Sequence, residues 1–249
     1  MQRPVFAANW KMNHGPSDAR AFFRTFLAHY ARRPDRSIIF FPPTPTLAAV
    51  IDMLKERPDI VVGVQNIHWE DKGAFTGEIS APIARDAGAH FTLIGHSERR
   101  HVFGETDDEA AKKMAAALRS RLLPVLCVGE KIEERERGEA EAVVLRQLRA
   151  GASLVQPHDL ANALVAYEPV WAIGTGKTAT PEDASTMHAV VRQELHRLVG
   201  EKAGVVPILY GGSVNRGNAA SLLAAPGVDG LLVGGASLDA EAWTSIVRT

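Results

Sequence analysis

Eight short apolar segments, rich in β-branched and aromatic residues, recur along this 249-residue chain and constrain its fold more than any other feature. Their starts lie roughly 20 to 45 residues apart, which leaves room for a crossover helix and favours parallel pairing. Most show no polar alternation, as is typical of a sheet buried on both faces. The predicted strands are 5–8, 38–41, 60–64, 91–94, 125–128, 164–167, 207–210 and 230–233.

Helix signals lie between these strands. Residues 180–183 (Thr-Pro-Glu-Asp) offer an N-cap, a proline in the first turn and an acid three residues after the cap, and residues 106–109 repeat this pattern without the proline. The charged run 130–141 is interpreted as a solvated helix surface, because mixed charges at close spacing support an exposed helix. The apolar face predicted after Thr180 consists of Ala184, Met187, His188, Val191, Leu195, Leu198 and Val199.

The alternation of strands and helices continues without a linker or a change in composition. With 46% hydrophobic and 23% charged residues, the chain has the composition of a folded globular protein. Its length suits one domain with a large core. We therefore predict a single α/β domain over residues 1–249, a closed (β/α)8 barrel, with a doubly wound open sheet as the alternative.

The charge balance and the cysteine count limit partners and location. Lys and Arg number 28 against 29 Asp and Glu, so no global basic field attracts nucleic acid or a membrane surface. No apolar run is long enough for a membrane span, and the N-terminus does not have the pattern of a signal peptide. Cys127 is the single cysteine and cannot form a disulfide within the chain. These features predict a cytoplasmic protein.

Polar residues and glycines follow most of the predicted strands. The carboxyl ends of the strands in a barrel meet at one mouth, where the chemistry of such folds takes place. The sequence therefore predicts a site at this mouth. The segments concerned are Asn9-Trp10-Lys11, Gln65-Asn66, Gly95-His96-Ser97-Glu98, Glu168-Pro169, Gly211-Gly212-Ser213 and Gly234-Gly235.

These residue types suit acid–base chemistry on a small anion. Paired glycines let backbone N–H groups approach a phosphate, and neighbouring seventh and eighth strands are a common phosphate site in barrels. Glu168 is a candidate general base beneath the apolar loop 170–178, His96 a candidate neutral hydrogen-bond donor at a helix start, and Lys11 a candidate anion partner. Taken singly, each of these residues also has a purely structural explanation. The glycines could be turn residues, Glu168 a solvated carboxylate, His96 a core histidine and Lys11 a surface charge.

Three other motifs fail on spacing. Residues 176–178 (Gly-Lys-Thr) resemble the end of a phosphate-binding P-loop, but the leading glycine would fall at Trp171. The pattern Gly174-x-Gly176-x-x-Ala179 follows a loop and not a strand, so it is a poor dinucleotide fingerprint. His96 and His101 are five residues apart, off one helix face, and support no metal site.

Five segments, read together, resemble the triosephosphate isomerase family over the whole chain. They are residues 9–13 (Asn-Trp-Lys-Met-Asn), 95–100 (Gly-His-Ser-Glu-Arg-Arg), 166–177, which begins Ala-Tyr-Glu-Pro-Val-Trp, 210–214 (Tyr-Gly-Gly-Ser-Val) and 233–236 (Val-Gly-Gly-Ala). The resemblance implies a barrel enzyme that interconverts dihydroxyacetone phosphate and D-glyceraldehyde 3-phosphate through an enediolate, with a glutamate base and a neutral histidine and with no cofactor or metal.

The resemblance also implies a role for individual residues. Glu168 would move the proton, His96 would polarise the carbonyl, Lys11 would supply positive charge, Asn9 would orient the substrate, and Glu98 would support the site. Phosphate would bind the backbone N–H groups of Gly174, Ser213, Gly234 and Gly235 beside Asn9 and Lys11, and a closed lid would be held by Tyr210 and Ser213 with Gly176 and Ala179.

A homodimer is a further implication of the resemblance. The loop 66–80, with Phe75 and Thr76 near its tip, would enter the neighbouring subunit; an ordinary mobile loop is the alternative. Within this loop, His68 and Trp69 differ from the residues that the family resemblance leads us to expect. The difference affects the expected dimer contact and leaves the catalytic assignment unchanged. Two other functions stay open: a phosphate-binding barrel enzyme for a larger substrate, and a catalytically silent anion-binding protein.

Overall fold

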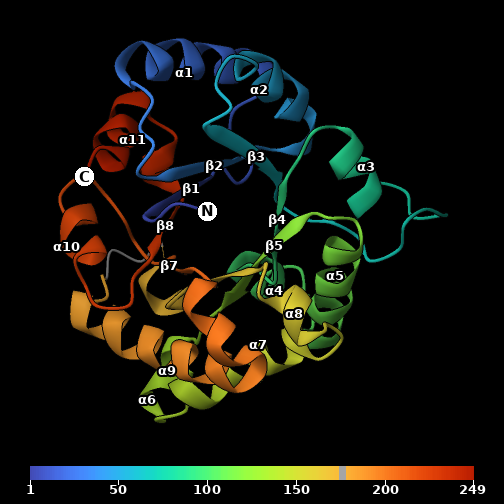
Figure 1. The fold of residues 1–249 in the computed structure, drawn as a ribbon, viewed down its shortest axis with the longest axis vertical. Coiled ribbons are helices and arrows are strands. Elements are labelled where there is room, and N and C mark those ends of the chain that lie inside the picture. Colours follow the sequence, from blue (N-terminus) through green and yellow to red (C-terminus); the bar gives the residue numbers. More distant parts are fainter. Residues whose placement is uncertain (174–177) are drawn as a thin grey trace.

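The computed structural model describes residues 1–173 and 178–249, and over these residues eight parallel strands form a closed barrel (Figure 1). Each strand pairs with the next one along the chain, and β8 returns to β1, where Val5 lies opposite Gly230. This pairing leaves no open sheet edge, so the predicted closed barrel is confirmed and the open sheet is wrong. The strands are β1 (Val5–Asn9), β2 (Ser37–Phe41), β3 (Ile60–Val64), β4 (Phe91–Ile94), β5 (Leu123–Val128), β6 (Leu164–Tyr167), β7 (Ile208–Tyr210) and β8 (Gly230–Val233).

Helices surround the barrel on its outer face (Figure 1). The α-helices are α1 (Pro16–His29), α2 (Leu47–Met53), α3 (Ala81–Asp86), α4 (Ser97–His101), α5 (Asp107–Arg119), α6 (Ile132–Glu136), α7 (Ala140–Ala152), α8 (Pro157–Leu160), α9 (Pro181–Val199), α10 (Ala219–Leu223) and α11 (Ala240–Val247). Short 3-10 helices are η1 (Thr44–Thr46), η2 (Val170–Ala172), η3 (Gly200–Val205) and η4 (Gly235–Ser237).

Both predicted capping boxes are confirmed. At the start of α9, the Thr180 hydroxyl accepts the Asp183 N–H at 3.1 Å while the Asp183 carboxylate accepts the Thr180 N–H at 3.0 Å. Thr106 and Glu109 make the same reciprocal pair at the start of α5. Because these bonds satisfy N–H groups that the first turn leaves free, each helix begins at a defined residue.

The core has two layers, which follow from the alternation of side chains along each strand. In β1, Val5 and Ala7 point into the barrel interior, whereas Phe6 and Ala8 pack outward against the helices. Aromatic rings fill the outer layer near the end of β1: Trp10 packs within 5.0 Å of Phe22 and 5.6 Å of Phe40, between ring centroids. The Trp10 indole N–H also donates to the Ser237 carbonyl at 3.1 Å, which fixes the chain just before Lys11.

The charged run 130–141 differs from its prediction in two ways. It forms two helices, α6 and the start of α7, because Gly138 adopts a left-handed φ of 75° between them. Its first residue, Glu130, is fully buried, whereas the prediction placed the whole run on a solvated surface. The pattern of charges alone cannot distinguish a buried carboxylate near the end of a strand from the exposed carboxylates of the helix that follows.

Within residues 1–173 and 178–249, no helix has the length and apolar character needed to cross a membrane.

Candidate active site

The strand ends surround a cavity of about 260 Å³ at the mouth of the barrel. Side chains from β1, β4 and β6 meet there with the glycine-rich segments after β7 and β8. Seven residues that the sequence predicted for the site line this cavity: Asn9, Lys11, His96, Glu168, Ser213, Gly234 and Gly235.

Glu168 and His96 form the centre of the site. Both are buried, and the His96 Nε2 lies 3.0 Å from the Glu168 Oε1. The other carboxylate oxygen of Glu168 accepts the Ser97 backbone N–H at 2.9 Å. Asn9 approaches from β1, with its Nδ2 atom 3.2 Å from the same Nε2. The carboxylate and the ring nitrogen are thus fixed side by side.

The charge states of this pair follow from their surroundings. Burial alone would raise the pKa of Glu168, but His96, the Ser97 N–H and Lys11 outweigh it and hold the pKa below its usual range. Burial alone would lower the pKa of His96, whereas the adjacent Glu168 and, to a smaller extent, Glu98 raise it. Glu168 is therefore ionised near neutral pH, the state that a general base requires.

The second nitrogen of His96 reports on its tautomer. His96 is the N-cap of α4, and its Nδ1 accepts the Glu98 backbone N–H at 3.2 Å. A nitrogen that accepts a hydrogen bond carries no proton, so this contact places the ring proton on Nε2, which faces the cavity. The contact favours a neutral imidazole, and the carboxylate of Glu168 favours the charged form.

Lys11 is held in a strained conformation above the cavity. Its φ is 51°, which is uncommon for a residue other than glycine and is typical of functional sites. Hydrogen bonds impose it: the Asn9 Oδ1 accepts the Lys11 N–H at 3.0 Å, and the Gln65 side chain donates to the Lys11 carbonyl at 2.8 Å. The Lys11 Nζ lies 2.6 Å from the Glu98 Oε1. Glu98 thus orients the lysine and lines the neighbouring pocket.

The segments after β7 and β8 form a rim of the cavity that consists largely of backbone. A Cβ atom at Gly234 would lie 3.2 Å from the Lys11 Cε, and one at Gly235 would meet none of the described residues within 4 Å. Together with Ser213, these residues expose main chain to the cavity next to a positive side chain. Such an arrangement fits a phosphate group.

Gly174, predicted to bind phosphate, and Gly176, predicted to hold the lid, lie outside the described residues. Tyr210 and Ala179, which were also predicted to hold the lid, are both buried. Burial raises the pKa of Tyr210 to about 12, the Asp183 charge adds to this, and the Ala179 backbone N–H opposes it.

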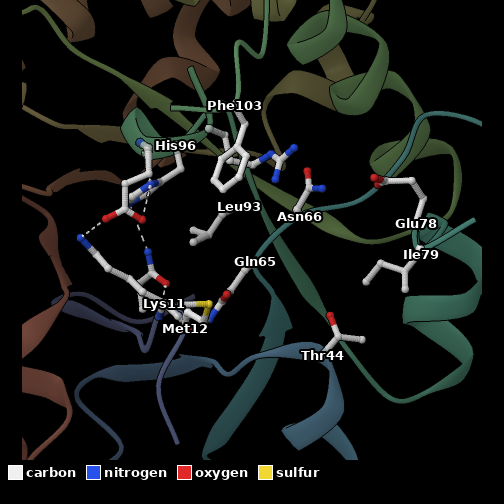
Figure 2. Close-up of a pocket in the computed structure, with 14 residues that line it drawn as sticks. Lys11, Met12, Thr44, Gln65, Asn66, Glu78, Ile79, Leu93, His96 and Phe103 are labelled. Atoms are coloured by element: carbon white, nitrogen blue, oxygen red, sulfur yellow. Dashed lines mark hydrogen bonds and ion pairs between the residues drawn. The ribbon is translucent and has the colours of Figure 1, made fainter. Parts of the chain in front are cut away.

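A second pocket of about 400 Å³ adjoins the site. Figure 2 shows Lys11 and His96 on one side of this pocket and Thr44, Glu78 and Ile79 on the opposite side. The segment between β3 and α3, which contains Phe75 and Thr76, stands out from the barrel (Figure 1). The Phe75 side chain is 43% exposed.

The sequence did not predict two groups near Glu168: one binds its carboxylate, and the other binds the chain on either side of it. The Ser97 N–H that binds Glu168 is a backbone donor, and a sequence carries no signal for its direction. Glu130 lies beneath the segment that follows Glu168, and its Oε1 accepts the Tyr167 hydroxyl at 3.1 Å and the Trp171 indole N–H at 2.8 Å. Its position two residues after the end of β5 could have indicated a site residue, but Glu130 also begins the charged run 130–141 and was interpreted as part of it.

Fold and site together define a class: a closed (β/α)8 barrel with a buried glutamate–histidine pair and a glycine-rich rim around the cavity at its mouth. The family model described as triosephosphate isomerase matches residues 4–249. Similar proteins named triosephosphate isomerase include those of Moorella thermoacetica (47% identical) and Chloroflexus aurantiacus (46%), each aligned over 100% of this chain and 99% of its own length. A third, from a Roseiflexus species, is 46% identical over 100% of this chain and 98% of its own. The chain belongs to the triosephosphate isomerase family.

Proposed function

We propose that this chain interconverts dihydroxyacetone phosphate and D-glyceraldehyde 3-phosphate by proton transfer. The observation that carries the proposal is the buried Glu168–His96 pair, 3.0 Å apart, in a cavity of about 260 Å³ that Lys11 and the glycine rim complete. A cavity of this size suits a three-carbon phosphate ester, and membership in the family supports the assignment.

Glu168 and His96 divide the proton transfers between them. The ionised Glu168 removes a proton from the carbon next to the carbonyl group, and the His96 Nε2–H donates a hydrogen bond to the carbonyl oxygen as it gains charge. The resulting enediolate receives the proton back from Glu168 on the neighbouring carbon, while His96 moves a proton between the two oxygens. Each proton that is removed in this scheme is returned, so the reaction needs no oxidant or reductant.

His96 acts as a neutral donor in this scheme. A substrate carbonyl oxygen bound at Nε2 would separate His96 from the Glu168 carboxylate, the contact that raises the pKa of His96. Burial, Lys11 and the Glu98 N–H on Nδ1 would then favour the neutral ring, and only the weaker effect of the Glu98 carboxylate would oppose them.

Phosphate binding is assigned to the rim. The backbone N–H groups of Ser213, Gly234 and Gly235 would hold the phosphate oxygens, Lys11 would supply charge, and Asn9 would orient the carbonyl end. We extend the proposal to Tyr210 and Ala179 as a latch next to the site, supported by the burial of both residues and by the effect of the Ala179 N–H on the pKa of Tyr210. Gly174 is added to the phosphate site, and Gly176 to the latch, on the family resemblance alone.

A coupled assay of purified protein in the presence of a chelator tests the activity. We expect turnover of D-glyceraldehyde 3-phosphate without added metal or nucleotide. Faster turnover of a larger phosphate ester would favour the alternative barrel enzyme, and phosphate binding without any turnover would favour the silent anion-binding protein. Either result would overturn the assignment.

The assembly and the location are further parts of the proposal. We propose a homodimer in which the loop 66–80 of one subunit, led by Phe75 and Thr76, enters the second pocket of the other. Large apolar side chains exposed beside this pocket support it: Met12 (95% exposed) and Phe103 (70%). The lone, buried Cys127 is consistent with a reducing compartment and supports the proposed cytoplasmic location.

A further inference from the structure

A buried carboxylate holds the chain on both sides of the proposed base. Glu130 is fully buried, and its Oε1 binds Tyr167, immediately before Glu168, and Trp171, three residues after it. The Glu130 carbonyl also accepts the Val170 backbone N–H at 3.0 Å. The position of the Glu168 backbone therefore depends on the position of Glu130.

Arg135 of α6 connects this carboxylate to the rest of the mouth. Its Nη1 lies 3.5 Å from the Glu130 Oε1, and its guanidinium carbon lies 4.8 Å from the centroid of the Trp171 ring. Its Nη2 lies 2.5 Å from the Asp183 Oδ1, in the first turn of α9. One guanidinium thus contacts α9, the buried anion and the segment that follows β6.

The charges favour this arrangement. A buried carboxylate that loses its counter-charge is strongly destabilising, whereas a planar guanidinium can bind two carboxylates and lie against an aromatic face at once. Burial would raise the pKa of Asp183, but the Thr180 hydrogen bonds and Arg135 hold it below its usual range, so Asp183 stays ionised as a partner.

We propose that Arg135 is a positioning residue for Glu168. It neutralises Glu130 and holds Trp171 in place, and it thereby keeps the carboxylate of Glu168 at the distance from the substrate carbon that proton transfer requires. Arg135 touches no substrate atom in this proposal, which rests on the proposed isomerase activity. A small misplacement of a catalytic group lowers the rate of the chemical step far more than it weakens substrate binding.

The alternative is an ordinary surface ion pair. The Arg135 side chain is 34% exposed, and exposed pairs contribute little to stability. Arg137, two residues on, provides the matched control: it pairs with Glu139 on the exposed surface, away from Trp171 and Glu130.

The test compares Arg135→Ala, Arg135→Lys and Arg137→Ala with the wild type, measuring kcat and KM for D-glyceraldehyde 3-phosphate and thermal unfolding of each protein. We expect kcat of Arg135→Ala to fall about 10- to 100-fold with KM changed less than about threefold. Guanidinium ion at low, non-denaturing concentration should restore part of kcat. Arg135→Lys should retain an intermediate kcat, and Arg137→Ala should match the wild type with or without guanidinium.

Several outcomes would overturn the proposal. A folded Arg135→Ala variant with wild-type kcat, or a loss that appears in KM alone, would leave Arg135 a surface ion pair. If Arg135→Ala does not fold, Arg135→Gln and Arg135→Lys decide, and unchanged kcat in both would refute the role. An inactive wild type would refute the proposed function itself, and this inference with it.

Discussion

Two glycines next to Glu168 set how closely the chain can pack around the proposed base. A Cβ atom at Gly129 would lie 1.7 Å from the Glu168 carbonyl oxygen, a distance no side chain can occupy. A Cβ atom at Gly211 would lie 2.8 Å from the Glu168 Cγ and 3.3 Å from the Tyr167 carbonyl oxygen, so a methyl group there would push mainly on the Glu168 side chain. The absence of side chains at these two positions is what allows Glu168 to reach His96.

Gly211→Ala should therefore lower kcat while the barrel stays folded. The added methyl group displaces the Glu168 carboxylate, and we expect a loss of about 10- to 100-fold in kcat. Steady-state kinetics with thermal unfolding measures both effects. Gly204→Ala is the control, because a Cβ atom there would have no neighbour within 4 Å in the part of the chain that the structure describes. A Gly211→Ala variant with wild-type kcat would show that the glycine does not constrain the base.

At the scale of elements, α9 carries a group that ties stability to pH. His188 of α9 is fully buried, its Nδ1 lies 3.0 Å from the Gly227 carbonyl, and its ring packs against Tyr167. Burial lowers the pKa of His188 to about 4. The unfolded chain, with a pKa near 6.5, binds a proton that the folded chain excludes, so the stabilisation is complete above about pH 6.5 and is lost as pH falls toward 4.

His188→Gln should remove this pH dependence. Between about pH 7 and about pH 4.5, the free energy of unfolding of the wild type should fall by about 2 to 3 kcal/mol more than that of the variant. Urea unfolding at the two pH values measures the difference, with exposed His158→Gln as the control. Equal losses in the wild type and His188→Gln would mean that His188 titrates normally in the fold.

Elements with strong local signals were predictable from the sequence, and those with competing signals were not. The start of α9 follows from the capping residues Thr180 and Asp183, whose bonds lie within one turn. The division between α6 and α7 depends on the left-handed Gly138 inside a run that reads as one exposed helix. Glu130 is buried because Tyr167 and Trp171 pack onto its carboxylate, and only the tertiary structure brings these residues together.

For the whole molecule, the pattern of eight strands predicted a barrel but left its closure undecided, because pairing of β1 with β8 joins residues more than 220 positions apart. The strand-end motifs predicted which side chains meet in the cavity. The distances between them, the strained φ of Lys11 and the Ser97 N–H on Glu168 come from the packing of the strands and loops around them.

The proposed dimer predicts the behaviour of a single surface substitution. The wild type should sediment at about twice the 26.9 kDa mass of the chain, and Phe103→Asp should sediment as a monomer with reduced activity, because a charge would face the entering loop. Leu154→Asp, which changes another exposed apolar residue away from the pocket, should remain dimeric. A wild-type monomer at micromolar concentration would contradict the assembly.

The replacement of Glu168 by glutamine tests the central claim most directly, because it keeps the shape of the side chain and removes the base. The measurement is kcat/KM for D-glyceraldehyde 3-phosphate, with binding of inorganic phosphate and thermal unfolding measured on the same protein. We predict a loss of about 100- to 10,000-fold in kcat/KM with phosphate binding and folding retained. A folded Glu168→Gln enzyme with the wild-type rate would contradict the account.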